Sequence, residues 1–536
     1  MSTFEELKQR YMLSSSNGGS GTSGGPSVAV FTGCEVVPLV DGAGYFADLK
    51  TEVARLGGGT AAGEFIYIAG WWCGRDFSLD AANSGNSLAD LLIQKARAGV
   101  DVRVLGWVIA PEVMQHPQVQ ASPLVSGILG LNGDTMSFIK RLQAEPALAN
   151  KACLNILAHP AGACHLKMAV TGSSTRAVGF TGGLDLQQGR HTSNWRDVQT
   201  RVSGPAVQQF FESFRSMWNE VRGRPPVSLT APSSQAAGSP PVTVTSHSSG
   251  MPDLPARAIA STSTRKMHVQ GARTLPRFNF AVSGSIGGMP RNTPLSYAPA
   301  GLFEVRAVWE KALKAAQSYI YIEDQAFSSR EIMDWVNGVL KAKPGLKVVL
   351  LTGLGDPSLS PTAIELKLFA HAINNHLCAS LSAADRDRIG LFSHTTKTVH
   401  SKTSIVDDQW SIIGSSNAMR RSLFTDFEHS IAYMDEAGEA VLRYREQLWG
   451  TYFQASVPDM NSALGRWFAI PFRNSAAGAP QSGEIQRLRL PLTTNPLTAD
   501  EQVLFDEIYD CDSRDTWGDD LMGLYMRRQG AGSFAP

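Results

Sequence analysis

Apolar residues recur along this chain with two different spacings, one typical of helices and one typical of strands. Residues 44–72 begin with apolar positions three and four apart and end in the continuous run FIYIAGWW. Residues 302–327 follow the same order, with a helical pattern leading into YIYI. Spacings of three and four place side chains on one helix face, whereas short apolar runs rich in β-branched and aromatic residues favour buried strands. Each segment therefore predicts a helix followed by a strand.

A second helix–strand pair follows each of these segments, at residues 88–107 and 330–353. Helices that alternate with strands in this way predict an α/β fold. The two halves of the chain repeat the same order of elements, which indicates an internal duplication at the scale of a domain. We therefore expect two similar α-β-α sandwich lobes, packed face to face around one shared active site.

Changes in composition divide the chain further. At 536 residues it exceeds one ordinary hydrophobic core. A short helix and then Ser/Gly-rich sequence begin the chain, and Pro, Ser, Thr and Ala dominate its middle. We expect a flexible leader at 1–27, an N-terminal lobe at 28–221, a linker or excursion at 222–264, a C-terminal lobe at 265–455, and an extension with an acidic segment at 456–536.

Charge and cysteine content narrow the function. Lysine and arginine together number 48, and so do aspartate and glutamate, which gives a formal net charge of zero. Proteins dedicated to nucleic acid usually carry a basic excess, so nucleic acid is not expected as a partner. The six cysteines show neither a Cys-x-x-Cys pair nor any other metal-ligand spacing, and no metal or other cofactor is expected.

Each half of the chain carries a His-x-Lys sequence on an apolar strand. The second half contains HSKTSIVDDQWSIIGSSN, from His400 to Asn417, and the first contains HLKMAVTGSSTRAVGFTGGLDL, from His165. Residues i and i+2 of a strand point to the same face, so His165 lies beside Lys167 and His400 beside Lys402. In the second half, a returning strand would bring a Gly-Ser turn and the Asn417 amide close to the pair.

Two such units facing one another would surround one point with two imidazoles, two ammonium groups and several hydrogen-bond donors. This set suits the equatorial oxygens of a phosphodiester in its transition state. The two histidines can supply a nucleophile and a general acid without a metal. The sequence therefore predicts a metal-free phosphoryl-transfer site shared by the two halves.

These motifs resemble those of the phospholipase D superfamily over most of residues 28–220 and 265–450. YIEDQAF at 321–327 resembles the Y-I-E-N-Q-x-F element of lipid-acting members. GFTGGLDLQQGR and NWRDVQTRVSGPAV resemble the segments that follow the first motif in eukaryotic-like phospholipases D. The lipid-acting branch is therefore favoured over the small nuclease branch. The complete second signature consists of His400, Lys402, Asp407, Gly414, Ser415 and Asn417.

The resemblance implies that one histidine forms a covalent phosphohistidine while the other protonates the leaving alcohol, and that acidic residues further along hold both rings. We expect His165 as nucleophile and His400 as general acid, an assignment that can be reversed. The catalytic candidates are His165, Lys167, His400, Lys402, Asn417, Asp407, Asp197 and Glu428, with Asp426 as a rival for Glu428. The substrate-binding candidates are Asp185, Ser415, Gly183, Glu323 and Gln325.

The first motif departs from the pattern at Gly172, where the resemblance leads us to expect an aspartate equivalent to Asp407. In the family that aspartate sits at a strand end and acts structurally, away from the phosphorus. The residues TGSSTR that begin at Thr171 predict a lengthened hairpin turn, which can dispense with the carboxylate. We therefore expect both half-sites to be active and Gly172→Asp to leave turnover within about tenfold.

The function implied by the resemblance is hydrolysis of the distal phosphodiester of membrane glycerophospholipids to phosphatidic acid and a head-group alcohol. Transphosphatidylation is also implied, and the membrane surface and the glycerophospholipid would be the partners. The alternatives are a phospholipid synthase or transferase, a nuclease of the same superfamily and, from another class, a non-catalytic lipid-binding pseudo-enzyme. The oligomeric state stays open.

The N-terminus lacks a basic segment followed by an apolar one, so no conventional secretory signal is expected. No run approaches the roughly 18 apolar residues of a spanning helix. We expect a protein that is cytoplasmic or exported by a specialised secretion route, and that acts at membrane surfaces.

Overall fold

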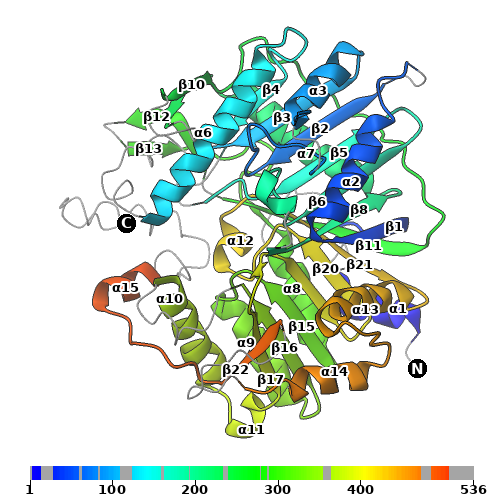
Figure 1. Cartoon of the computed structure of the whole chain (residues 1–536), viewed down its shortest axis with the longest axis vertical. Coiled ribbons are helices and arrows are strands. Elements are labelled where there is room, and N and C mark those ends of the chain that lie inside the picture. The colour runs from blue at the N-terminus through cyan, green and yellow to red at the C-terminus, as the bar shows by residue number, and fades with distance from the viewer. Residues whose placement is uncertain are drawn as a thin grey trace.

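Two lobes stacked one on the other make up the computed structural model of the protein, blue to green in one and green to orange in the other (Figure 1). The structure describes residues 3–13, 28–59, 63–81, 85–108, 123–157, 162–191, 194–232, 240–277, 279–286, 289–353, 364–472 and 484–505.

Helices and strands alternate in the N-terminal lobe in the order that the sequence predicts. A hydrogen bond at the start of one helix shows why the boundaries lie where they do: the Ser87 side chain accepts from the Asp90 amide, and Asp90 reaches back to the Ser87 amide. The elements of this lobe are β1 (Phe31–Val40), α2 (Asp41–Ala54), β2 (Phe65–Gly70), α3 (Leu88–Arg97), β3 (Asp101–Trp107), α6 (Pro123–Gln143), β4 (Ala152–Asn155), β5 (Lys167–Gly172), β6 (Ala177–Gly182), η1 (Gln188–His191), β7 (Trp195–Arg196), β8 (Val198–Ser203) and α7 (Val207–Arg222).

The C-terminal lobe repeats this order. Its second large helix also begins at a serine, since the Ser329 side chain accepts from the Ile332 amide. The elements are β11 (Met267–Leu275), β14 (Leu302–Phe303), α8 (Glu304–Ala315), β15 (Tyr319–Asp324), α9 (Arg330–Ala342), β16 (Lys347–Thr352), α10 (Ile364–Ala372), the π-helical segment η3 (Ile373–Cys378), α11 (Ala383–Arg386), β17 (Ile389–His394), β18 (Thr398–Val399), β19 (Lys402–Val406), β20 (Trp410–Gly414), α12 (Arg420–Phe424), β21 (Glu428–Asp435) and α13 (Glu439–Phe453).

One sheet runs through both lobes. Outward from its middle the N-terminal strands follow the order β1-β8-β6-β5-β2-β3-β4, and the C-terminal strands follow β11-β21-β20-β19-β15-β16-β17. Strands β2, β3 and β4 run parallel in the N-terminal half, and β15, β16 and β17 run parallel in the C-terminal half. The strands nearer the middle of the sheet pair antiparallel in both halves. The matching orders confirm an α/β fold with an internal duplication.

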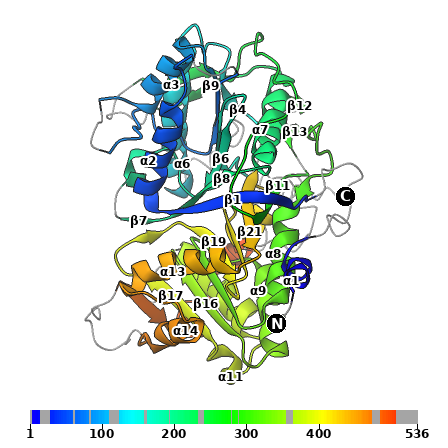
Figure 2. The same cartoon turned by 90° about the vertical axis from the view of Figure 1, so that its right-hand side faces the viewer.

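The lobes join where β1 pairs antiparallel with β11, and β1 crosses the middle of the molecule (Figure 2). Register shifts along this pair between Phe31 and Cys34. A second contact lies deeper, where the Thr181 hydroxyl at the end of β6 donates to the His429 carbonyl in β21 over 3.0 Å. The hairpin ends of the two lobes therefore face each other across the junction.

Alternation along the central strands builds three apolar cores. In β15, Tyr319 and Tyr321 belong to a core that spans both lobes and includes α7 and α13, whereas Ile320 and Ile322 face the core under α8 and α9. The corresponding β2 residues divide in the same way, with Ile66 facing the core under α2, α3 and α6. Because successive strand residues point to opposite faces, a fully buried strand can serve two cores at once.

Segments outside the predicted lobes pack against them, and one small hairpin lies within the predicted bounds of the C-terminal lobe. The predicted leader contains α1 (Phe4–Tyr11), which lies beside α8 in Figure 2; the Ser/Gly-rich residues 14–27 lie outside the described part. Within the predicted linker, β9 (Ser228–Ala231) and β10 (Val242–Thr245) pair and contact α6. A second small hairpin combines β12 (Phe280–Ile286) and β13 (Met289–Asn292). The predicted linker or excursion thus contains two short strands of its own.

The C-terminal extension also adds to the fold. It consists of α14 (Met460–Ala469), β22 (Ile485–Leu488) and α15 (Ala499–Leu504). Strand β22 pairs antiparallel with β17 and closes that edge of the sheet, and Trp467 of α14 enters the shared core. Most of the predicted acidic segment lies beyond residue 505, outside the described part. Within the described residues, no helix combines the length and the apolar character needed to cross a bilayer.

Candidate active site

The two His-x-Lys sequences stand at equivalent places in the two lobes. Lys167 begins β5 and Lys402 begins β19, and each histidine stands two residues before its lysine. All four side chains are buried, with His165 the most exposed at 9%. Each lysine pairs across the sheet with the end of a parallel-sheet strand, Lys167 with Gly70 and Lys402 with Asp324. The two His-Lys pairs therefore stand at the same end of equivalent strands, one in each lobe.

Each histidine is held by a carboxylate of the opposite lobe. His400 Nδ1 lies 2.7 Å from Asp197 Oδ2, and His165 Nδ1 lies 3.1 Å from Glu428 Oε1. Engagement of Nδ1 fixes the ring orientation and leaves Nε2 available for another contact. Neither Nε2 has a hydrogen-bond partner among the residues that the structure describes. The two half-sites are therefore interlocked, because each lobe orients the histidine of the other.

Short backbone contacts between the lobes bring each carboxylate to the histidine of the opposite lobe. Strands β7 and β18 run parallel, and the His400 amide donates to the Arg196 carbonyl over 2.7 Å. At the equivalent place, Cys164 forms a bridge with Phe427, whose amide donates to the Ala163 carbonyl over 2.8 Å. In both cases the residue after the bridge is the carboxylate. Backbone pairing therefore sets the distance between each acid and its histidine.

Glu428 rather than Asp426 holds the first histidine. Glu428 accepts hydrogen bonds from the hydroxyls of Ser415 and Ser422, the latter at 2.6 Å, in addition to its contact with His165. Asp426 instead accepts from the Ala163 amide at 2.7 Å and pairs with Arg421 at 3.2 Å. It supports the loop that carries the histidine without contacting the ring.

Both lysines are anchored close to their histidines. Lys167 Nζ donates to the His165 carbonyl over 2.8 Å and lies 3.4 Å from Asp185 Oδ1. It also sits 4.9 Å from the centre of the Trp71 ring. Lys402 Nζ donates to the His400 carbonyl and to Gln325 Oε1, the latter over 3.4 Å. The two lysine side chains are thus held in place within one buried site.

Burial and the lysines control protonation of the histidines. Burial lowers the pKa of His165 and of His400 well below its usual range, and the neighbouring lysines lower both further. Burial also raises the pKa of the partner carboxyls, to about 7 for Asp197 and about 7 for Glu428. Both effects disfavour charge on each imidazole–carboxyl pair before an anion binds.

Two further groups of the site, Lys402 and Asp324, follow the same rule. Burial lowers the pKa of Lys402 to about 8 and raises that of Asp324 to about 7, while the two groups partly offset these shifts by attracting each other. The site therefore has several groups that titrate near neutral pH. Sites arranged for proton transfer are typical places for such shifts.

The similarity of this chain to known proteins agrees with this geometry. A family model described as "Phospholipase D" matches residues 60–194, and one described as "Cardiolipin synthase, PLD-like domain" matches residues 310–450. The two matches fall on the two lobes and each contains the elements around one half-site. The chain belongs to the phospholipase D superfamily.

Relatives within this superfamily are distant. Phospholipase D beta 2 of Arabidopsis thaliana is 23% identical over 337 residues, which are 51% of this chain and 34% of that protein. Phospholipase D gamma 2 of the same plant is 23% identical over 332 residues, 50% of this chain and 36% of that protein. The chain thus spans about a third of the length of the curated relatives it matches.

Among solved structures, phosphatidylserine synthase of Haemophilus influenzae Rd KW20 is similar with a TM-score of 0.46 and 13% identity, over 80% of this chain and 88% of that one. Polyphosphate kinase of Porphyromonas gingivalis is similar with a TM-score of 0.38 and 11% identity, over 74% of this chain and 47% of that one.

Asp407, placed with the catalytic candidates because it belongs to the superfamily signature, lies away from the histidines. It accepts hydrogen bonds from the backbone amides of Gln317, Ser318 and Tyr319 and from the Tyr11 hydroxyl, at 2.6 to 2.8 Å. Its backbone has φ of 57°. It organises the turn before β15, which is a structural role.

Gly172, where the superfamily pattern has aspartate, lies between two strands without room for a side chain. It pairs with Phe65 in β2 and Ala177 in β6, and a Cβ added there would lie 2.4 Å from the Arg176 carbonyl oxygen. The turn is built around glycine, so an aspartate here should destabilise the hairpin, whereas the expectation for turnover stays a prediction. In the loop before β2, the Glu64 carboxylate accepts a hydrogen bond from the Gly57 amide over 2.8 Å.

Three predicted substrate-binding residues have other positions. Glu323 faces away from Lys402 and accepts from the hydroxyls of Ser401, Tyr321 and Tyr452 at 2.6 to 2.8 Å. Gly183 makes room for Asp197, whose Oδ1 would lie 2.0 Å from an added Cβ. As described above, the Ser415 hydroxyl supports Glu428. All three residues support neighbouring groups of the protein, whereas Asp185 and Gln325 contact the lysines of the site.

Asn417 lies beside this support. Its backbone amide donates to the Ser422 hydroxyl over 3.0 Å, and its buried side-chain Oδ1 has no partner in the described part of the chain. Sequence reasoning missed three further residues of the site: Asp324, Arg190 and Trp195. The register pairs Asp324 with Lys402, so Asp324 faces the lysine and Glu323 the opposite side; no local sequence signal shows this register.

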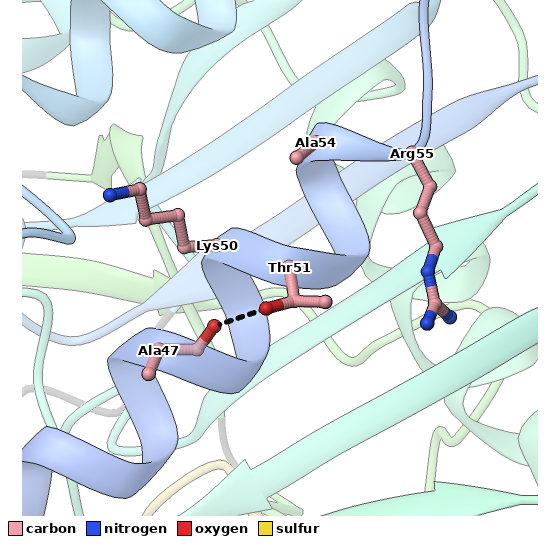
Figure 3. A pocket seen from close by; sticks show the side chains of 5 residues that line it. All are labelled: Ala47, Lys50, Thr51, Ala54 and Arg55. Carbon is pink, nitrogen blue, oxygen red and sulfur yellow. Dashed lines mark hydrogen bonds between the residues drawn. The ribbon is translucent and has the colours of Figure 1, made fainter.

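A hollow on the exposed face of α2 is not part of this site. Figure 3 shows its lining, and its two cations already have partners: Lys50 Nζ lies 2.8 Å from Asp80, and Arg55 lies 3.0 Å from Glu52. The lining residues are Ala47, Lys50, Thr51, Ala54 and Arg55. Among the residues that the structure describes, no group of three or more His, Cys, Asp or Glu is placed to hold a metal.

Proposed function

We propose that this chain is a phospholipase D-type phosphodiesterase, which hydrolyses the distal phosphodiester of membrane glycerophospholipids to phosphatidic acid and a head-group alcohol. The observation that carries the proposal is the pair of histidines, each held at Nδ1 by a carboxylate of the other lobe and each next to a buried lysine. Two oriented imidazoles supply a nucleophile and a proton donor, which an in-line displacement at phosphorus requires.

In the first step, Nε2 of His165 attacks phosphorus, an N–P bond forms, and the bond from phosphorus to the head-group oxygen breaks. His400 gives its Nε2 proton to that oxygen, so the alcohol leaves neutral. In the second step, His400 takes a proton from water, the water oxygen bonds to phosphorus, and the N–P bond breaks. His165 and phosphatidic acid are released, and His400 is protonated again.

Differences between the two carboxylates support this assignment. Asp197 lies 2.7 Å from His400, whereas Glu428 lies 3.1 Å from His165 and shares its oxygens with two serine hydroxyls. Hydrogen bonds from serines reduce the capacity of a carboxylate to stabilise an imidazolium. His400 thus has the stronger partner for a protonated ring, as a general acid requires, and His165 is left as the nucleophile.

The lysines connect substrate binding to protonation. Lys167 and Lys402 lower the pKa of His165, and Lys402 together with Arg190 lowers that of His400, in each case after burial. A phosphodiester carries a negative charge that offsets these cations. Binding should therefore raise the pKa of the general acid and protonate it when the substrate is in place.

Product analysis on mixed phospholipid liposomes tests the proposal. Wild-type protein should release phosphatidic acid, and in ethanol it should also form phosphatidylethanol, because a phosphohistidine can be captured by a small alcohol. The double variant His165→Ala/His400→Ala is the control for a contaminating hydrolase. Liposome binding without any product would favour a lipid-binding pseudo-enzyme, and cleavage confined to nucleic acid would favour a nuclease.

A phospholipid synthase or transferase is the second candidate. It is favoured by the match of residues 310–450 to a family model described as a cardiolipin synthase domain. Both functions would use the same covalent intermediate and differ in the alcohol or water that resolves it. A hydrolase should give mainly phosphatidic acid in the presence of millimolar glycerol or serine, whereas a transferase should give mainly the exchanged phospholipid.

A further inference from the structure

The two half-sites differ in the group that follows the glycine-rich turn. Counted from the equivalent glycines Gly182 and Gly414, the first half-site has Asp185 where the second has Asn417. An amide can donate a hydrogen bond to a phosphate oxygen, whereas an ionised carboxylate only accepts. The first half-site therefore lacks a donor at this position and has an acid where a phosphate oxygen would approach.

Arg190 stands next to this acid. Its Nη2 lies 3.1 Å from Asp185 Oδ2, while Lys167 lies 3.4 Å from the other oxygen of the same carboxylate. The guanidinium stacks 3.6 Å from the centre of the Trp195 ring, and that ring meets His400 edge-on at 5.5 Å. Asp185 thus lies between Lys167 and Arg190 and contacts both, close to the histidines.

The arginine has unused donors although it is buried. Arg190 is 3% exposed, and its Nε and Nη1 have no hydrogen-bond partner in the described ranges of the chain. Burying an unsatisfied guanidinium donor is costly, so such groups are normally bound to something. Its charge reaches the reactive groups, since it is among the causes that lower the pKa of His400 and that hold down the pKa of Asp197.

We propose that Arg190 is a substrate-binding residue that donates to a non-bridging oxygen of the scissile phosphate, and that Asp185 positions it. The proposal rests on the proposed function for its substrate class, a phosphodiester, but the shared chemistry is an oxyanion with several acceptor oxygens. In the first half-site Asp185 would then orient the Arg190 guanidinium, which donates to the phosphate. In the second half-site the Asn417 amide would donate directly. Guanidinium–phosphate hydrogen bonds are charge-assisted and stronger than neutral ones.

Arg103 offers a matched control in the same lobe. It is also buried, pairs with Asp101 at 3.0 Å and lies 5.0 Å from the centre of the Trp218 ring. Two of its donor contacts go to the Pro252 and Asp253 carbonyls, so it is bound within the structure. Arg103→Lys should therefore show what a buried arginine loses for structural reasons alone.

The test measures binding of inorganic phosphate by calorimetry and kcat/KM on a soluble short-chain phosphatidylcholine. Arg190→Lys should weaken phosphate binding at least about tenfold and lower kcat/KM at least about a hundredfold. Arg103→Lys should leave both within about threefold of wild type, even where its melting temperature falls. Wild-type phosphate affinity and kcat/KM in Arg190→Lys would overturn the proposal while leaving the proposed function intact.

The converse result separates the two ideas. If the wild-type protein cleaves no phospholipid but binds phosphate in a manner that needs Arg190, the proposed function fails and the assignment of Arg190 stands. Asp185→Asn provides a second test if Arg190→Lys does not fold. In that background the guanidinium no longer pairs with a carboxylate but still donates to phosphate, so adding Arg190→Gln should weaken phosphate binding at least about tenfold. A cost of about threefold or less there would contradict the assignment of Arg190.

Discussion

The two half-sites have the same reactive pair on different supports. In the C-terminal lobe, Asp407 ties the hairpin after His-x-Lys to the turn before β15 through three backbone amides. In the N-terminal lobe that position is Gly172, packed without room for a side chain, and Glu64 supports the corresponding loop from within. Comparison of the lobes shows that the aspartate of the motif serves the fold, since the lobe without it still places its histidine and lysine in the site.

Residues beside the lysines differ as well. Lys402 has Gln325 and Asp324 next to it, whereas Lys167 has Trp71 and Gly70 at the equivalent positions. At these two strand positions the second lysine thus has polar neighbours, whereas the first has an aromatic face, in addition to its contact with Asp185. The two lobes have similar frames, and the interlocked carboxylates make the half-site of each lobe depend on the other.

Removal of either histidine should have the largest effect. His165→Ala and His400→Ala should each lower kcat/KM by at least about a thousandfold, roughly 4 kcal/mol in barrier, because the displacement then lacks its nucleophile or its acid. His371→Ala on α10 serves as a control that should keep near-normal activity. If His165→Ala retained activity, the first half-site would be a relic and the equivalence of the lobes would fail.

Restoring the motif aspartate should harm the protein. Gly172→Asp should lower the free energy of unfolding by on the order of 2 to 3 kcal/mol, because its Cβ would overlap the Arg176 carbonyl and Ala177. Gly172→Ala introduces the same Cβ and should cost a similar amount in urea denaturation. A melting temperature for Gly172→Asp above that of wild type would show that the two turns can be exchanged.

Removal of Asp407 should reduce stability more than chemistry. Asp407→Ala leaves three amides and the Tyr11 hydroxyl without their acceptor and should cost on the order of 2 kcal/mol in unfolding free energy. Tyr11→Phe removes one of these four donors and should cost about 1 kcal/mol or less. At a temperature where both variants are folded, kcat should stay within about threefold of wild type; a hundredfold loss would assign Asp407 to the chemistry.

The pH dependence should reveal how substrate charge acts on the general acid. Burial and nearby cations lower the pKa of His400 in the free protein, so protonated acid is lost as pH rises through a value below the usual histidine range. A bound phosphodiester offsets those cations and raises that pKa. The basic limb of kcat/KM should therefore lie at lower pH than the basic limb of kcat. Coincident limbs for a soluble substrate would contradict this coupling.

Removal of metal ions should have the smallest effect. Two histidines suffice for the displacement, so exhaustive dialysis against EDTA should leave kcat on a soluble substrate unchanged within about twofold. A soluble substrate is used because divalent ions can aid adsorption to liposomes. Loss of activity that one added divalent ion restores would contradict the metal-free mechanism.

The sequence by itself determined the order of helices and strands in both lobes and the places of the two His-x-Lys pairs. Periodicity of apolar residues predicted the helix–strand order of both lobes, because that order depends on local spacing. The two His-x-Lys pairs could be placed on strand ends, since neighbours two apart in a strand share a face. Membership of the phospholipase D superfamily followed from motifs that are contiguous in the chain.

Only the tertiary structure decided which groups meet. Asp197 holds His400 and Glu428 holds His165 because strands of opposite lobes pair, and no local pattern contains a contact between residues 203 or 263 positions apart. The choice of Asp324 over Glu323 depends on the register of β15 against β19. Arg190 joined the site because a turn folds it onto Trp195 and Asp185. Local sequence specifies the elements, whereas charges and donors are matched through long-range packing, which pattern alone does not encode.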